Sequence, residues 1–142
     1  MANVYDVAAY ILRKVGSVTS MKLQKLVYYA QAWSLVWDET PLFEERIEAW
    51  ANGPVVPALY ECHKGEFRLQ SIPQGNPDKL SDNQRDTIDK MLEFYGDKTS
   101  QWLSDLTHKE DPWIEAREGI PAGQRSNQEI TSASMMEYYS GL

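Results

Sequence analysis

The chain has 142 residues, of which 42% are hydrophobic and 25% are charged, so we expect one folded domain over residues 1–142 and exclude a disordered chain. Its net charge of −7 disfavours direct nucleic-acid binding, and the lack of a recognisable secretory signal or run of about 18 apolar residues indicates a cytoplasmic protein without a membrane partner. One cysteine and two histidines supply neither an internal disulfide nor a His/Cys zinc site, and we expect no metal and no cofactor.

Two helices are predicted in the first quarter of the chain. Apolar residues recur at helical spacing over residues 4–15, after a capping box formed by Asn3 and Asp6. Thr19 is expected to cap a second helix over residues 20–37, in which apolar and semi-apolar side chains cover two faces. We therefore expect this second helix at the centre of the fold. One of its buried stripes is expected to consist of Leu23, Leu26, Val27, Ala30, Trp33 and Trp37.

The middle of the chain predicts a small β element. Residues 45–50 alternate like a short strand, and a turn signal follows at residues 52–54. A short helix is expected over residues 57–64, and residues 67–70 alternate again. We expect the two strands to pair antiparallel across this helix.

Helical signals dominate the rest of the chain. A loop is predicted over residues 72–80, followed by a helix over residues 81–96 that begins with a capping box of Ser81 and Gln84. The remaining helices are expected at residues 101–106 with Thr99 or Ser100 as cap, at residues 111–117 with Asp111 as cap, and from Ile130 and Thr131 onward with Met135, Met136 and Tyr139 buried. These elements predict a mainly α (α+β) fold: a compact single-domain bundle of five to seven helices with a two- or three-stranded antiparallel β element.

Two clusters of reactive side chains are candidates for an enzyme active site. Cys62 and His63 are adjacent, but neighbours on a helix point about 100° apart, so the histidine is poorly placed to activate the thiol. His108 and Glu110 are the centre of a second hypothesis, a small hydrolase or nucleotide-handling enzyme. The alternative is structural, with His108 satisfying carbonyls at a helix end. Because no phosphate-binding loop or nucleophile motif accompanies them, we predict no catalytic residue.

One face of the second predicted helix combines Lys22, Lys25 and Tyr29, a pattern compatible with contact to an acidic segment or a nucleic acid, although two lysines are too few to indicate such a site. The alternative is that the lysine stems cover apolar surface and the tyrosine ring is buried. Charge is unevenly distributed, at +3 over residues 1–37 (four basic, one acidic) and −10 over residues 38–142 (ten basic, twenty acidic). An acidic body indicates a cationic protein partner, although acidity also serves solubility.

Three segments of the chain contain residues that recur in a known protein family. They contain first Lys22, Leu23, Gln24, Lys25, Leu26, Tyr28 and Gln31, then Ala49, Trp50, Gly53, Pro54, Val55 and Tyr60, and finally Leu103, Ser104, Thr107, His108, Pro112 and Trp113. In order and approximate spacing, these segments resemble the Panacea domain family of SocA-like antitoxins, which occur in phages, prophages and toxin–antitoxin operons. The resemblance covers residues 1 to about 118, and Ala51 and Asn52 depart from the family pattern.

The resemblance implies a non-enzymatic, mainly helical antitoxin that binds and neutralises a cognate protein toxin. Some members of the family are associated with delivery of the toxin to a protease, so the resemblance also allows a role as a proteolytic adaptor. The candidate partner-binding residues are Lys22, Lys25, Tyr29, Thr107, His108, Glu110 and Trp113. The other motif residues are interpreted as a structural junction, namely Leu23, Gln24, Leu26, Tyr28, Gln31, Trp50, Gly53, Pro54, Val55, Tyr60 and Pro112. The enzyme centred on His108 and Glu110 and a phage host-takeover protein remain as alternatives.

Overall fold

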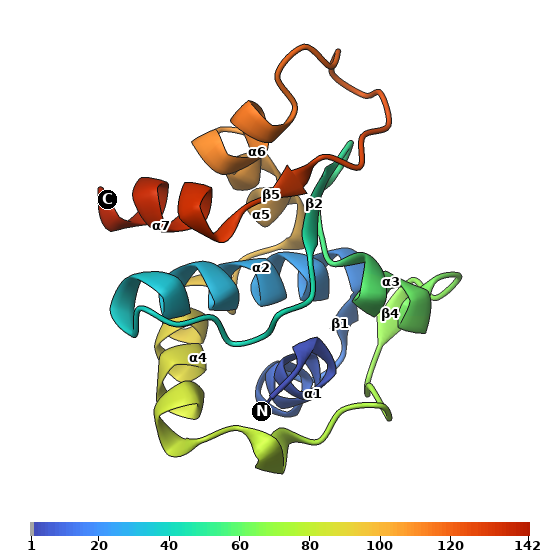
Figure 1. Ribbon diagram of the computed structural model, residues 1–142. Helices are drawn as coiled ribbons and strands as arrows, with labels where there is room; N and C mark the ends of the chain where they lie inside the picture. Colours follow the sequence, from blue (N-terminus) through green and yellow to red (C-terminus); the bar gives the residue numbers. More distant parts are fainter. Residues whose placement is uncertain (1) are drawn as a thin grey trace.

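The computed structural model describes residues 2–142, which contain seven α-helices, a short 3-10 helix and two small antiparallel sheets (Figure 1). The helices are α1 (Val4–Val15), α2 (Ser20–Trp37), α3 (Pro57–His63), α4 (Asp82–Tyr95), α5 (Ser100–Thr107), α6 (Asp111–Ala116) and α7 (Ser132–Ser140), with the 3-10 helix η1 at Pro77–Lys79. The strands are β1 (Val18–Thr19), β2 (Ile47–Trp50), β3 (Gly53–Val55), β4 (Arg68–Leu69) and β5 (Glu129–Ile130). The predicted fold class is confirmed.

Side-chain caps fix the start of most of the longer helices. Asn3 and Asp6 form a reciprocal capping box at the start of α1, and Ser81 and Gln84 form another at the start of α4. Thr19 accepts a hydrogen bond from the backbone of α2. All three were predicted, because capping depends on residues only three positions apart.

Helix α2 crosses the middle of the molecule, with α1 and α4 on one side and α7 on the other (Figure 1). Every residue from 23 to 32 is buried, as expected of a helix enclosed on all sides. Trp37 is an exception to the predicted stripe: it is the last residue of α2, is 47% exposed, and stacks on Trp33 at the surface. None of the helices in residues 2–142 has the length and hydropathy that a membrane span requires.

The predicted pairing of residues 45–50 with residues 67–70 is wrong. Strand β2 is the centre of a three-stranded sheet, because a two-residue turn returns the chain directly into β3 and β5 occupies the other edge, where Ile47 lies opposite Ile130. Both edges of β2 are therefore occupied, and β4 pairs instead with β1. The partners of a strand this short depend on distant segments that local alternation does not encode.

Two predicted helix starts also need correction. Ile130 belongs to β5, and Thr131 caps α7, which begins at the next residue. Glu110 occupies the cap position of α6, whereas Asp111 is the first residue of that helix. No side chain caps α6, because the Glu110 carboxylate binds tyrosine hydroxyls instead.

Candidate functional site

The second and third motif segments meet at the turn between β2 and β3. Side chains of α5, α6 and the residue after α5 bind three consecutive backbone carbonyls of this turn. These contacts are Trp113 Nε1 to Trp50 O (2.9 Å), Ser104 Oγ to Asn52 O (3.2 Å) and His108 Nε2 to Ala51 O (3.2 Å). The ring of His108 also packs on Trp113, with centroids 4.1 Å apart. The α5–α6 corner therefore fixes the position of the hairpin turn.

The first motif segment supplies buried amides that bind the backbone of neighbouring segments. Gln24 Oε1 accepts from Val56 N (2.9 Å), and its Nε2 lies 2.9 Å from His63 Nε2. Because the amide nitrogen donates, His63 Nε2 accepts and the ring is neutral, in agreement with burial, which lowers the pKa of His63. Gln31 binds the backbone of Phe43 in a similar way. Both amides thus tie α2 to the backbone of neighbouring segments.

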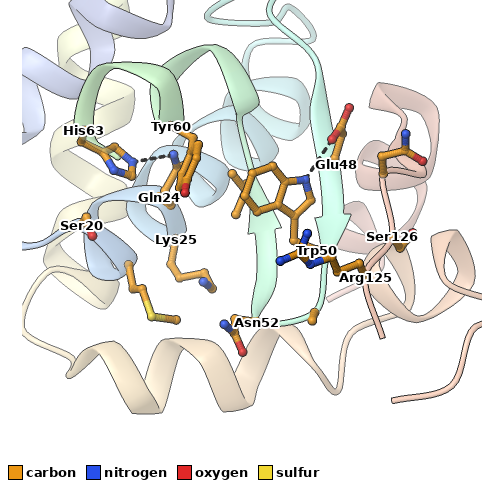
Figure 2. A pocket seen from close by; sticks show the side chains of 14 residues that line it. Ser20, Gln24, Lys25, Glu48, Trp50, Asn52, Tyr60, His63, Arg125 and Ser126 are labelled. Carbon is orange, nitrogen blue, oxygen red and sulfur yellow. Dashed lines mark hydrogen bonds between the residues drawn. The ribbon is translucent and has the colours of Figure 1, made fainter. Parts of the chain in front are cut away.

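A pocket of about 800 Å³ opens between the start of α2, the β2–β3 hairpin, α3 and residues 125–127 (Figure 2). Trp50 and Tyr60 form an aromatic wall, with ring centroids 5.0 Å apart in an edge-to-face arrangement. The full lining consists of Ser20, Met21, Gln24, Lys25, Glu48, Trp50, Ala51, Asn52, Val55, Tyr60, His63, Arg125, Ser126 and Asn127. The first two motif segments thus share one concave site, and the third segment supports its hairpin.

Lys25 is the most unusual residue of this pocket. Its side chain is 1% exposed and points from α2 toward the turn that carries Asn52 (Figure 2). Within residues 2–142 its ammonium has neither a hydrogen-bond partner nor a carboxylate at salt-bridge distance, and burial lowers the pKa of Lys25 to about 8. Gly53 provides the necessary space: its φ is +125°, and a Cβ there would lie 2.5 Å from Lys25 Cε. The glycine of the motif is therefore matched to the buried lysine.

The seven predicted partner-binding residues divide by exposure. Lys25, Tyr29, Thr107 and Glu110 are buried, whereas Lys22, His108 and Trp113 are partly exposed. Lys25 and Thr107 come together beside Gly53. Tyr29 and Glu110 bind each other inside the core and, unlike Lys25, do not line the pocket, so they offer no surface to a partner. The Tyr29 ring is thus buried, as in the structural alternative.

Glu110 links three helices through tyrosine hydroxyls. Its Oε1 accepts from Tyr29 of α2 (2.7 Å) and from Tyr139 of α7 (2.7 Å), and the Tyr139 hydroxyl lies 3.0 Å from that of Tyr28. Burial raises the pKa of the Glu110 carboxyl, and the two tyrosine hydrogen bonds oppose this rise. The network holds α2 and α7 to the start of α6 and leaves Oε1 no room for a substrate.

The geometry does not assemble an acid–base pair from the reactive residues found in the sequence. Both ring nitrogens of His108 lie against backbone carbonyl oxygens, and Glu110 binds tyrosines. Cys62 contacts a carbonyl of its own helix, while the neighbouring His63 binds Gln24. Within residues 2–142, no group of three or more histidine, cysteine, aspartate or glutamate side chains is arranged to hold a metal ion.

Asn52 and residues 125–127 line the pocket, but the sequence did not predict this role. Residues 125–127 belong to an irregular stretch between α6 and β5 with no periodicity. Buried Arg117 positions this stretch by donating to Ala49 O (3.1 Å) and Gln124 O (2.7 Å). The only sequence signal for that role is an arginine before a glycine-rich segment, which is too common to interpret.

Comparison with known proteins gives two matches. Residues 23–114 match the protein family described as "Antitoxin SocA-like, Panacea domain". The chain is also similar to antitoxin SocA of Caulobacter vibrioides (strain NA1000 / CB15N), with 42% identity over 45 residues, which is 32% of this chain and 24% of that protein. The match thus spans about a quarter of the length of that relative. No solved structure matches the chain.

Proposed function

Because this chain belongs to the Panacea-domain family of SocA-like antitoxins, we propose that it neutralises a cognate protein toxin by binding it directly. One observation carries the proposal: three motif segments, which lie almost entirely within the matched residues 23–114, build and support one pocket with an aromatic wall. Tryptophan and tyrosine dominate the binding energy of protein interfaces. The reactive residues of the chain, in contrast, are engaged in structural contacts.

The toxin-binding surface in this proposal consists of the pocket and its partly exposed neighbours. Lys22 lies beside the pocket-lining Met21, which is 39% exposed. His108 and Trp113 contact the backbone of the hairpin turn, at the carbonyl oxygens of Ala51 and Trp50. The acidic body of the chain, at −7 overall, favours a basic toxin through long-range attraction. We place the pair in the cytoplasm and in a phage or prophage operon, in keeping with the family.

Co-expression with the product of the adjacent gene tests the proposal. We expect that product to stop growth of a bacterial host and the wild-type chain to restore growth. Trp50→Ala removes the aromatic wall and should abolish the rescue, because truncation of a central interface tryptophan costs ~2 kcal/mol or more. Trp37→Ala is the matched control, since Trp37 is an exposed tryptophan at the opposite end of α2 and should leave the rescue intact.

The same cultures separate two modes of neutralisation. If the chain acts by occupying the toxin, the toxin accumulates in rescued cells; if it delivers the toxin to a protease, the toxin half-life shortens. A neighbouring product that is harmless, or that remains toxic at equal soluble levels of the wild-type chain, contradicts the antitoxin proposal.

A further inference from the structure

The pocket contains a buried cation without a counterion. Lys25 lies in the pocket lining, is 1% exposed, and its ammonium points into the space beside the hairpin turn (Figure 2). A buried ammonium ordinarily has a carboxylate partner, because the loss of hydration is otherwise uncompensated. Burial is the sole cause of the lowered pKa of Lys25, and at neutral pH the group is still mostly protonated. The site therefore presents a positive charge that the chain itself does not neutralise.

The one carboxylate in the pocket lining is already bound elsewhere. Glu48 Oε1 accepts from Trp50 Nε1 (2.9 Å), and Glu48 Oε2 accepts from Arg46 Nε (2.9 Å). Figure 2 shows Glu48 on the far side of the Trp50 ring from Lys25. The indole thus separates the internal acid from the ammonium.

The remaining charged group at the pocket is a second cation. Arg125 lines the pocket and is exposed, with no carboxylate at salt-bridge distance among residues 2–142. Asn52, also exposed and lining the pocket, adds an amide donor next to Lys25. A positive pocket within a chain of net charge −7 is complementary to an anion.

We propose that this pocket receives one aspartate or glutamate side chain of the toxin, with its carboxylate against Lys25 and its stem along Trp50 and Tyr60. The inference rests on the proposed function and adds the chemistry of the contact. Figure 2 places the side chain of Asn52 beside Lys25, whereas a terminal carboxylate is usually captured by consecutive backbone N–H groups. This favours an acidic side chain over the toxin's C-terminus. A single acid in a basic partner would fix the register of docking.

Affinity measurements in a double-mutant cycle test this contact. The purified product of the adjacent gene is titrated with the wild-type chain, with Lys25→Met and with Lys90→Met. Lys25→Met should weaken binding at least about 30-fold, because one partner of a buried ion pair is lost. Lys90 is exposed on α4, and its replacement should change affinity by less than about twofold. One toxin Asp→Asn or Glu→Gln replacement should cause a similar loss that is not additive with Lys25→Met.

The outcomes distinguish the inference from the proposed function. Equal binding by wild type and Lys25→Met overturns the inference and leaves the antitoxin role standing. The inference is also overturned if the effects of Lys25→Met and of every acidic replacement in the toxin are additive. It is overturned as well if binding is lost only when the toxin is extended by three residues at its C-terminus. Absence of binding by the wild-type chain overturns both proposals.

Discussion

Replacing Lys25 with methionine is expected to stabilise the free protein by about 3 kcal/mol at pH 7, since lowering a lysine pKa from 10.5 to about 8 costs this much when the group is charged. Methionine is an unbranched side chain one heavy atom shorter than lysine, so it can fill most of the space beside Gly53 without a charge. Chemical denaturation of the two proteins measures the difference. The replacement should therefore stabilise the fold while impairing toxin binding, as expected of a residue kept for function.

The stability gain should also depend on pH. The unfolded lysine binds its proton up to about pH 10.5, and the folded one only up to about pH 8. Between these values the unfolded state holds more protons, so wild-type stability rises with pH relative to Lys25→Met. The gain should be full below pH 8 and should shrink toward pH 10.5. Lys90→Met should show no such trend, and a Lys25→Met protein that is less stable than wild type at pH 7 would contradict the described burial of an unpaired charge.

Replacing Gln31 with leucine is expected to destabilise the protein by about 2–5 kcal/mol, because two or more buried backbone groups lose their partner. Gln31 Oε1 accepts from Leu42 N (2.7 Å), and Gln31 Nε2 donates to Phe43 O (2.8 Å). All three residues are buried. Leucine fills much of the space but satisfies neither group. Urea unfolding of the variant measures the loss.

Gln101→Leu is the control for this prediction. Gln101 is also a helical glutamine, but it is exposed and binds only Asp105, one turn away, at the surface. Its replacement should change stability by less than about 0.5 kcal/mol. Equal, small effects of both replacements would show that the segment after α2 does not depend on the Gln31 amide.

Local chemistry allowed most of the helices to be predicted. Capping boxes at Asn3 and Ser81 and apolar spacing act within a few residues, so the starts of α1 and α4 followed directly from the sequence. The central position of α2 also followed, because apolar and semi-apolar side chains cover two faces of that helix. Long-range pairing was not encoded locally, and the partners of β2 and β4 were missed.

The positions of the candidate-site residues could be predicted only in part from the sequence. Lys25 and Tyr29 are one helical turn apart and were assigned to one binding face. In the structure Tyr29 binds Glu110 in the core, whereas Lys25 lines the pocket without a partner. The difference depends on the hairpin, α6 and α7, all of which follow α2 at a distance in the chain, with α7 as late as Ser132–Ser140. Gly53 was predicted to belong to a turn and to a structural junction, but its match to Lys25 appears only in three dimensions.

Titrating a fixed amount of purified toxin with the wild-type chain, and following the remaining toxin activity, tests neutralisation by occupancy most directly. We expect a linear loss of toxin activity that ends at a fixed molar ratio, with Lys25→Met requiring a large excess at the same concentrations. Complete inactivation by a small fraction of one equivalent, or identical curves for the two proteins, would contradict it.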